Sequence, residues 1–299
     1  MILIDSSNLA FRCHYVNQMF DPRSKTRKPF EYNGHITSAI FGFYKNLIML
    51  RRANPGRPMV CVFDSRNEDK HALVKQAQTD GVLDASEGYK GTRNRTSSDY
   101  ALVIEQLDEL RATLSFVCNL QVVKIDRQEA DDIIGSYAVQ YPGTIIVSGD
   151  GDFQQLVNEK TTILDGMKGI QVTVESLQSS GITPLQAIDV GALQGDTSDN
   201  IPGLPGIGEK TALKLVQTYG NLEDMIEKLA AKTKLNKAEA TVLQFKEKAL
   251  VCKKLKAIRT DLPVPAPSFG PGDRAQLTAL FQDRWGFKSL IPQLDILCT

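Results

Sequence analysis

The chain has 299 residues, 42% of them hydrophobic, with 35 basic and 35 acidic side chains, so its formal net charge is zero. This is enough for one large domain or two modest ones, and no apolar run approaches the roughly 18–20 residues of a membrane span. The five cysteines are scattered without C-x-x-C spacing, which excludes a zinc site of that kind, and MILIDSSN at the start is no secretory signal, so we expect reduced thiols and a cytoplasmic protein.

Continuous apolar stretches, most of them ending in an acidic residue, predict six strands. They are MILID (1–5), PMVCVFD (58–64), QVVKID (121–126), TIIVSGD (144–150), TTILD (161–165) and IQVTV (170–174). Apolar residues at helical spacing predict helices over 35–52, 100–116 and 129–140 between most of the first four strands. This alternation predicts an α/β fold with a mainly parallel central sheet flanked by helices.

Between residues 64 and 100 the alternation stops. The stretch is rich in Gly, Ser and Thr and carries several basic residues, among them Arg66, Lys90, Arg93 and Arg95. A segment this long outside the sheet is usually either functional or disordered. The residues alone leave both possibilities open.

Beyond about residue 180 the chain is predicted to be helical. Thr183 and Pro184 start a helix to residue 194, and a second helix over 209–219 closes at Gly220. Asn221 opens the next helix, and Asn236 with Glu239 has the spacing of a capping box. A proline-rich connection over 261–272 precedes a last short helix over 274–285. We therefore predict an α/β domain over 1–180 and a basic helical subdomain over 181–299.

Acidic residues gather in a few short motifs, at strand ends and helix starts. They are Asp5, Asp64, Glu129, Asp131, Asp132, Asp150, Asp152, Asp196 and Asp199. Ligand sites of open α/β sheets lie beyond the carboxyl ends of the strands, and converging carboxylates need counter-charge. Oxygen-only ligands suit Mg²⁺ or Mn²⁺, and this number of acids suggests two ions. Any single pair is also a common turn or helix-capping feature.

The stretch GDTSDNIPGLPGIGEKTALKLV (195–216) places two of these acids beside a glycine- and proline-rich hairpin that ends at a helix start. Backbone N–H groups and the helix dipole make such a position attractive to phosphate, and glycine permits close approach. An ordinary helix–turn–helix corner is the alternative. If the nine acids form one metal site, the 26 that remain face 35 basic residues, which favours a nucleic-acid partner. The lysines of the tail can equally be a solvated helix face.

Six segments in this order resemble the structure-specific 5′ nucleases, the flap endonucleases and 5′–3′ exonucleases. They are LIDSSNLAFR, VCVFDSR, YKGTRNR, EADDIIG, SGDGDFQQLV and the 195–216 stretch. Within the family they are most similar to the bacteriophage enzymes and the 5′-nuclease domain of bacterial DNA polymerase I. The resemblance implies a PIN-like fold with a helical arch at about 66–98 and a helix–three-turn–helix at about 184–219. Gly151 departs from the family, in which many members have lysine there.

The resemblance also implies roles for the site residues. Asp5, Asp64, Glu129 and Asp131 resemble ligands of a first metal ion. Asp150, Asp152 and Asp199 resemble ligands of a second, with Asp131 able to serve both and with Asp132 and Asp196 acting through water. Lys90 and Arg93 resemble arch residues that stabilise charge on the scissile phosphate. The residues expected to contact DNA are Gly203, Gly206, Ile207, Gly208 and Lys210 of the hairpin, where some members hold K⁺, and Arg66 and Arg95 of the arch.

From these features we expect a monomeric Mg²⁺-dependent 5′ nuclease of replication and repair, in a bacterium or a phage-infected host. Its substrates are expected to be 5′ flaps, nicked or gapped duplexes and RNA–DNA primer junctions, bound through phosphates and in a salt-dependent way. Three alternatives remain: a PIN-type ribonuclease, a catalytically inactive DNA-binding paralogue, and an acidic-site phosphatase.

Overall fold

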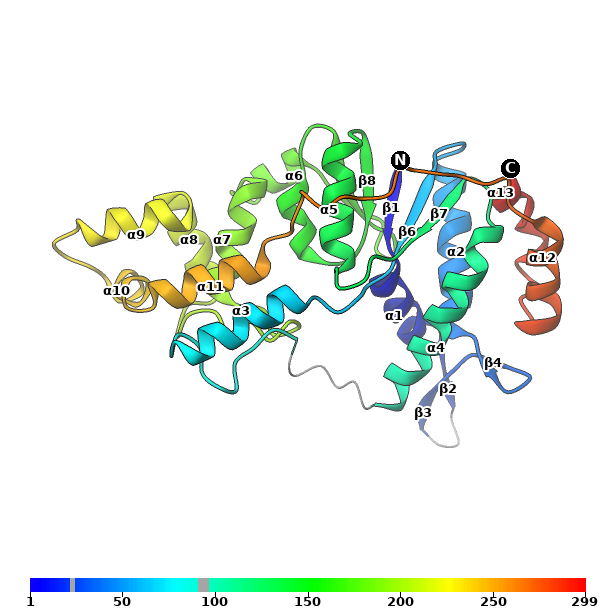
Figure 1. The fold of residues 1–299 in the computed structure, drawn as a ribbon, viewed down its shortest axis with the longest axis horizontal. Helices are drawn as coiled ribbons and strands as arrows, with labels where there is room; N and C mark the ends of the chain where they lie inside the picture. The colour runs from blue at the N-terminus through cyan, green and yellow to red at the C-terminus, as the bar shows by residue number, and fades with distance from the viewer. Residues whose placement is uncertain (22–24, 91–96) are drawn as a thin grey trace.

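The computed structural model describes residues 1–21, 25–90 and 97–299 and contains a six-stranded central sheet (Figure 1). The strand order is β10-β9-β8-β1-β6-β7, and of these strands β10 alone runs antiparallel to its neighbour. The strands are β1 (Ile2–Asp5), β6 (Met59–Val62), β7 (Leu120–Val123), β8 (Thr144–Val147), β9 (Thr161–Asp165) and β10 (Ile170–Val172). The mainly parallel α/β fold predicted from the apolar strands is confirmed.

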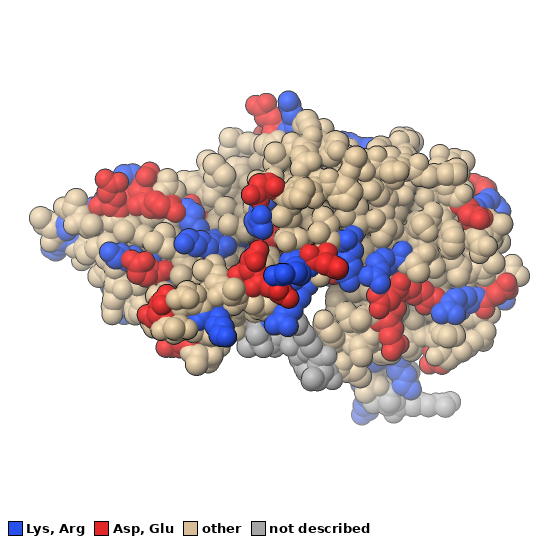
Figure 2. Space-filling view, in the orientation of Figure 1, with Lys and Arg blue, Asp and Glu red and all other residues tan. Residues whose placement is uncertain are grey.

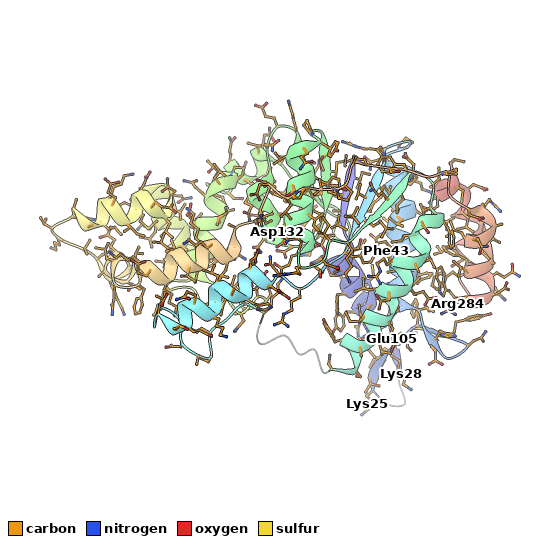
Figure 3. All side chains as sticks on the ribbon, viewed as in Figure 1. Lys25, Lys28, Phe43, Glu105, Asp132 and Arg284 are labelled. Carbon is orange, nitrogen blue, oxygen red and sulfur yellow. The ribbon has the colours of Figure 1, made fainter. Side chains whose placement is uncertain are left out.

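Both faces of the sheet are covered, which explains why its central strands are continuously apolar. One face packs against α1 (Ser6–Val16), α2 (Ser38–Ala53) and α4 (Ser98–Thr113), which continues into η1 (Leu114–Phe116). The other face packs against α5 (Ala130–Gln140). Successive residues of a strand alternate between the two cores, so Ile2 and Ile4 point to the first and Leu3 to the second. In Figure 3, Phe43 lies in the first of these layers.

The end of the chain returns to the α/β domain. The returning elements are α12 (Arg274–Ala279), η3 (Leu280–Arg284), η4 (Ile291–Gln293) and α13 (Asp295–Cys298). Phe281 and Trp285 are buried with Tyr44 of α2, in T-shaped and tilted ring contacts. The helical subdomain predicted over 181–299 therefore does not include these last residues, because their aromatic face completes the first core.

A cluster of helices forms the other end of the molecule, at the left of Figure 1. It contains α7 (Pro184–Gln194), α8 (Glu209–Tyr219), α9 (Leu222–Ala230), α10 (Lys237–Gln244) and α11 (Lys246–Lys256). The preceding α6 (Val174–Ser179) packs through Leu177 in the core that α5 shares with the sheet. The predicted caps Thr183, Asn221 and Asn236 each accept a hydrogen bond from the third backbone N–H of their helix. Helices α7 to α11 share an apolar core of their own.

The stretch that interrupts the alternation contains α3 (Glu68–Thr79), a helix that the apolar pattern did not predict but that lies where the resemblance implied a helical arch, at about 66–98. Asn67 caps it, and Val74 and Ala77 pack with Cys252 and Leu255 of α11. In Figure 1 it lies directly beside α11. The helix has few apolar residues because only one narrow stripe is covered.

Two small hairpins between α1 and α2 were also not predicted. They are formed by β2 (Gln18–Asp21) with β3 (Thr26–Pro29) and by β4 (Glu31–Tyr32) with β5 (His35–Ile36). Lys25 and Lys28 project from the first hairpin at the edge of the molecule (Figure 3). Within the described ranges, no helix combines the length and the apolar character that crossing a bilayer requires.

Candidate active site

Three parallel strands end at the same edge of the sheet and bring the first acids together. Asp5 ends β1, Asp64 follows β6, and Asp150 follows β8. The Asp5 carboxylate accepts hydrogen bonds from the Asn8 N–H (3.1 Å) and the Ser148 hydroxyl (2.9 Å). Burial, together with the charges of Asp64 and Asp150, raises the pKa of Asp5 to about 7. The strand ends thus concentrate negative charge that the fold itself does not fully compensate.

The start of α5 adds a second source of acids beside this edge. Glu129, Asp131 and Asp132 each offer a carboxylate oxygen within 4.8 Å of the others, which suits a metal ion. The Ala130 N–H donates to the Asp64 carboxylate (2.9 Å), so the end of β6 and the start of α5 are joined directly. The four acids that resemble first-metal ligands therefore lie on connected elements.

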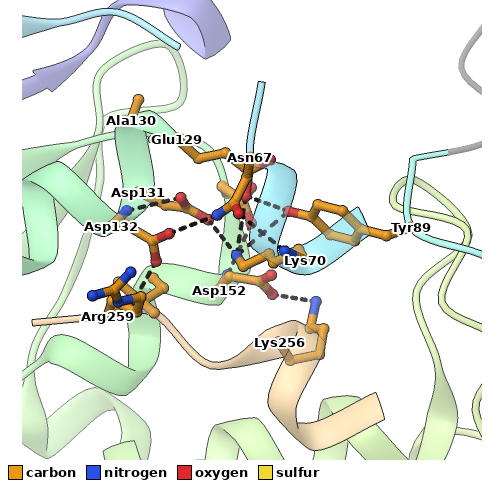
Figure 4. Close-up of polar contacts among 12 residues, drawn as sticks. Asn67, Lys70, Tyr89, Glu129, Ala130, Asp131, Asp132, Asp152, Lys256 and Arg259 are labelled. Carbon is orange, nitrogen blue, oxygen red and sulfur yellow. Dashed lines mark hydrogen bonds and ion pairs between the residues drawn. The ribbon is translucent and has the colours of Figure 1, made fainter. Parts of the chain in front are cut away.

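Two lysines and a tyrosine from the 66–98 segment surround Glu129, and Figure 4 shows two of them, Lys70 and Tyr89. The Lys70 ammonium lies 3.1 Å from Glu129 and 3.6 Å from Asp131, Lys90 pairs with Glu129, and the Tyr89 hydroxyl donates to Glu129 at 2.7 Å. Burial acts to raise the pKa of Glu129, but Lys90 and Lys70 lower it to about 2. Burial raises the pKa of Asp131, and the charges of Glu129 and Asp132 add to this although Lys70 opposes it. The pKa values of Glu129 and Asp131 are therefore shifted in opposite directions.

Lys90 is held in an unusual backbone conformation, with a φ of 54°. Such a left-handed conformation costs a non-glycine residue roughly 1–3 kcal/mol and needs support from its surroundings. The support is a hydrogen bond from the Lys90 N–H to the Asp199 carbonyl (2.6 Å), together with the ion pair to Glu129. These two contacts join the 66–98 segment to the loop after α7, which carries Asp199, and to the start of α5, where Glu129 lies.

The remaining acids come from η2 (Gly151–Leu156) and from the loop after α7. Asp150 caps η2 by accepting from the Asp152 N–H (2.9 Å), and Asp196 accepts from the backbone N–H of Ser198 (2.8 Å). Burial raises the pKa of Asp152 to about 6, and the neighbouring Asp150 adds to this. Lys256 of α11 forms an ion pair with Asp152, which Figure 4 shows, and a second with Asp196 at 2.7 Å.

Two adjoining cavities connect these groups, because Asp150 lines both. The first, of about 870 Å³, is lined by Asp5, Asp64, Glu129 and Asp131, together with Arg66 and Lys90. The second, of about 860 Å³, is lined by Asp152, Asp196, Lys256 and Gly208. Hard oxygen donors around accessible, partly uncompensated space fit divalent ions such as Mg²⁺.

Asp132 differs from the other acids. It is fully buried, and its two oxygens accept from the Asn67 side chain (3.0 Å) and the Arg259 N–H (2.8 Å). These bonds join α5 to the start of α3 and to the chain after α11. In Figure 3 it lies where these elements meet. The geometry gives Asp132 a bracing role between these elements.

The hairpin before α8 divides its predicted DNA-contacting residues into two sets. Gly206, Gly208 and Lys210 are exposed, and no side chain caps the helix at Gly208. Gly203 and Ile207 are buried instead, with Ile207 in the core of the helical cluster. Gly203 and Ile207 therefore stabilise the hairpin from inside, whereas Gly206, Gly208 and Lys210 are accessible to a ligand. Arg93 and Arg95 lie outside the residues that the structure describes.

Several site residues were not identified from the sequence, namely Asn67, Lys70, Tyr89, Ser148 and Lys256. Lys70 and Tyr89 lie in the basic stretch between residues 64 and 100. Their nearness in sequence to Lys90 was the only feature that could have indicated a place in the site. Lys256 is one of many lysines in the tail, and nothing local distinguishes it. Across the face in Figure 2, acidic and basic side chains are interspersed rather than segregated.

Comparisons with known proteins cover both parts of the chain. Residues 1–181 match the family model of the 5′–3′ exonuclease N-terminal resolvase-like domain, and residues 182–269 match that of the 5′–3′ exonuclease C-terminal SAM fold. DNA polymerase I of Bacillus subtilis is 31% identical over 308 residues, which is 98% of this chain and 32% of that protein. DNA polymerase I of Streptococcus pneumoniae is 32% identical over 309 residues, 99% of this chain and 33% of that protein. The chain thus spans about a third of the length of these relatives.

Solved structures share the fold. The zinc-bound T5 5′-exonuclease superposes with a TM-score of 0.65 at 18% identity, over 86% of this chain and 88% of that one. Flap endonuclease-1 from Methanococcus jannaschii gives a TM-score of 0.61 at 17% identity, over 99% and 91%. Both family models that match the chain describe nucleases. Within that class, the chain belongs to the 5′–3′ exonuclease family of structure-specific 5′ nucleases.

Proposed function

We propose that the chain hydrolyses phosphodiester bonds near 5′ ends in branched, nicked, gapped or primer-bearing DNA, using two divalent ions, Mg²⁺ or Mn²⁺. One observation carries the proposal. Acids from three strand ends, from α5 and from the loop after α7 line two cavities that meet at Asp150, and the hairpin glycine Gly208 lines the second. Ions bound there would activate water and stabilise the attacking and leaving oxygens.

The chain's own residues would hold and orient the reacting groups. Asp5, Asp64, Glu129 and Asp131 would hold the first ion, and Asp150, Asp152 and Asp199 the second. Lys90, kept beside Glu129, is placed to turn toward a phosphate that enters the first cavity, where it also lines the wall. Arg93 is proposed as its partner, and Arg66 and Arg95 as contacts to the DNA strand.

The hairpin would bind the duplex. Gly206, Gly208 and Lys210 expose backbone N–H groups and one positive charge at the N-terminus of α8, where phosphate is favoured. Binding of this kind recognises backbone shape and depends strongly on salt. A K⁺ ion at the hairpin, a monomeric state and a cytoplasmic location stay predictions.

The product ladder from a 5′-labelled flap tests the proposal. With Mg²⁺ the label should appear in short oligonucleotides, whereas with EDTA the flap should stay intact. Asp150→Asn and Asp199→Asn should each abolish cleavage in Mg²⁺ while flap binding persists. Normal turnover by either variant would refute the two-ion assignment.

Two further arms separate the alternatives. Single-stranded RNA should be cleaved much more slowly than the flap, since a PIN-type ribonuclease would show the opposite preference. Release of inorganic phosphate without oligonucleotides would indicate a phosphatase. Flap binding without cleavage by the unmodified protein would indicate an inactive paralogue.

A further inference from the structure

Lys256 is a buried cation among the acids that line the second cavity, Asp150, Asp152 and Asp196, which we call the second acidic group. Its ammonium pairs with the carboxylate of Asp152, which follows β8, and lies 2.7 Å from that of Asp196, which follows α7. The lysine is only 7% exposed, unlike most of the tail lysines. Two acids from distant parts of the chain therefore share one positive charge that α11 supplies.

The packing around the side chain fixes its position. The lysine stem passes over Gly191 of α7, where an added Cβ would lie 3.0 Å from the lysine Cε. The end of α11 is held to η2 by Gln155, which donates to the Lys256 carbonyl (3.0 Å) and accepts from the Ile258 N–H (2.9 Å). Both contacts direct the ammonium toward the acids rather than toward solvent.

We propose that Lys256 is an internal counterion that weakens divalent-ion binding at the second acidic group, and thereby sets the ion concentration at which this group fills. The inference rests on the proposed two-ion function. A buried ion pair resists separation, and a divalent ion beside the ammonium is repelled by it. An ion entering this group must therefore displace the ammonium or share the Asp152 and Asp196 oxygens with it.

This competition has a definite sign. If Lys256 only supported the fold of the site, removing it would loosen the acids and weaken ion binding. If it competes, removing its charge strengthens ion binding, although the ion-free protein becomes less stable. The two roles therefore predict opposite changes in affinity, and the affinity can be measured without any turnover.

Titration with Mn²⁺ alone, followed by the EPR signal of the free ion, provides the measurement. For Lys256→Met the weaker of the two dissociation constants should fall about tenfold or more. Lys256→Gln, which retains hydrogen-bond donors for both carboxylates, should change in the same direction. Lys256→Arg keeps the charge and should remain close to the unmodified protein. Lys254→Met removes an exposed lysine from the same helix and is the matched control.

Thermal unfolding of the same variants accompanies the titration. Lys256→Met should melt at a lower temperature than the unmodified protein in EDTA and recover in Mn²⁺, because the ion replaces the lost charge. Affinity that is unchanged or weaker in both Lys256→Met and Lys256→Gln overturns the proposal while leaving the two-ion function in place. Failure of the unmodified protein to bind Mn²⁺ at all removes the two-ion function and this inference together.

Discussion

Gly195 and Gly203 face each other across the neck of the loop that carries Asp196 and Asp199. A Cβ on Gly203 would lie 2.4 Å from the Gly195 backbone nitrogen, and both residues have positive φ, 81° and 62°. Reciprocal hydrogen bonds between Asp196 and Ile201, each 2.8 Å, close the loop just inside this neck. The two glycines thus let the backbone approach itself closely enough to fix the position of both acids.

Gly203→Ala should therefore lower the free energy of unfolding by roughly 2 kcal/mol or more, because the new Cβ meets backbone and the φ disfavours it. The loop would have to open, so binding of the second ion should weaken as well. Chemical denaturation and Mn²⁺ titration measure the two effects.

Gly208→Ala is the matched control for stability. Its φ is −95°, and nothing lies within 4 Å of its Cβ position. Because Gly208 is the N-cap of α8, alanine should lower the free energy of unfolding there by at most about 1 kcal/mol. A large loss in this variant, or none in Gly203→Ala, would contradict the account of the neck.

Asp5→Asn should stabilise the ion-free protein and abolish cleavage. Burial and neighbouring acids make the charged form of Asp5 unfavourable, and an asparagine can still accept from the Asn8 N–H. At about pH 8 we expect a gain of roughly 1–3 kcal/mol in EDTA. The same variant loses a proposed ligand of the first ion and should be inactive in Mg²⁺.

Asp165→Asn is the contrasting variant for that experiment. Asp165 accepts two hydrogen bonds from Arg12 (2.9 and 3.0 Å), and these contacts lower its pKa despite partial burial. Removing its charge should lower stability at the same pH. If both variants shifted stability in the same direction, the uncompensated charge at Asp5 would not be its cause.

The ion-free protein should become less stable as pH rises from about 4.5 to 7.5. Asp5 and Asp152 have pKa values of about 7 and about 6 in the folded state, above their ordinary value, so the folded state binds more protons across this range. Glu129 and Asp196, with pKa values of about 2, add stability that is complete above their ordinary pKa and is lost only in acid. Melting temperatures in EDTA across this range measure the trend.

Divalent ions should reduce this loss of stability with rising pH. They bind the deprotonated carboxylates and so offset the repulsion between buried negative charges. The comparison is the same melting series in Mn²⁺. A melting temperature that rises steadily from about pH 4.5 to 7.5 in EDTA would show that the acids are compensated within the fold.

Local sequence patterns were sufficient to predict the sheet and three of the helix caps. A strand such as β1 is continuously apolar because both its faces are buried, and Thr183, Asn221 and Asn236 satisfy helix N–H groups within three residues. The acids could be predicted to converge because parallel strands end at one edge. These inferences need only near neighbours or a single topological rule.

The remaining features depend on contacts between distant segments. Helix α3 is stabilised by α11, so its own sequence has a weak apolar pattern. Lys256 pairs with acids far away in the chain, and its sequence context is that of any solvated lysine. The inward placement of Ile207 likewise follows from the core that α7 and α8 share. Tertiary packing determines all three features, and the periodicity of the sequence carries no information about contacts between distant segments.

Lys210→Ala should weaken duplex binding without affecting stability. Lys210 is exposed in the first turn of α8, beside the uncapped N-terminus at Gly208. If it neutralises one phosphate, the slope of log affinity against log salt should fall by about one, and the loss should be similar for different sequences.

Lys288→Ala removes an exposed lysine beyond α12, at the other end of the molecule, and should leave both slope and affinity unchanged. Fluorescence anisotropy with a flap duplex in Ca²⁺ across a salt series measures these values. Equal losses from both variants would indicate a general charge effect and would remove the hairpin from the proposed DNA-binding surface.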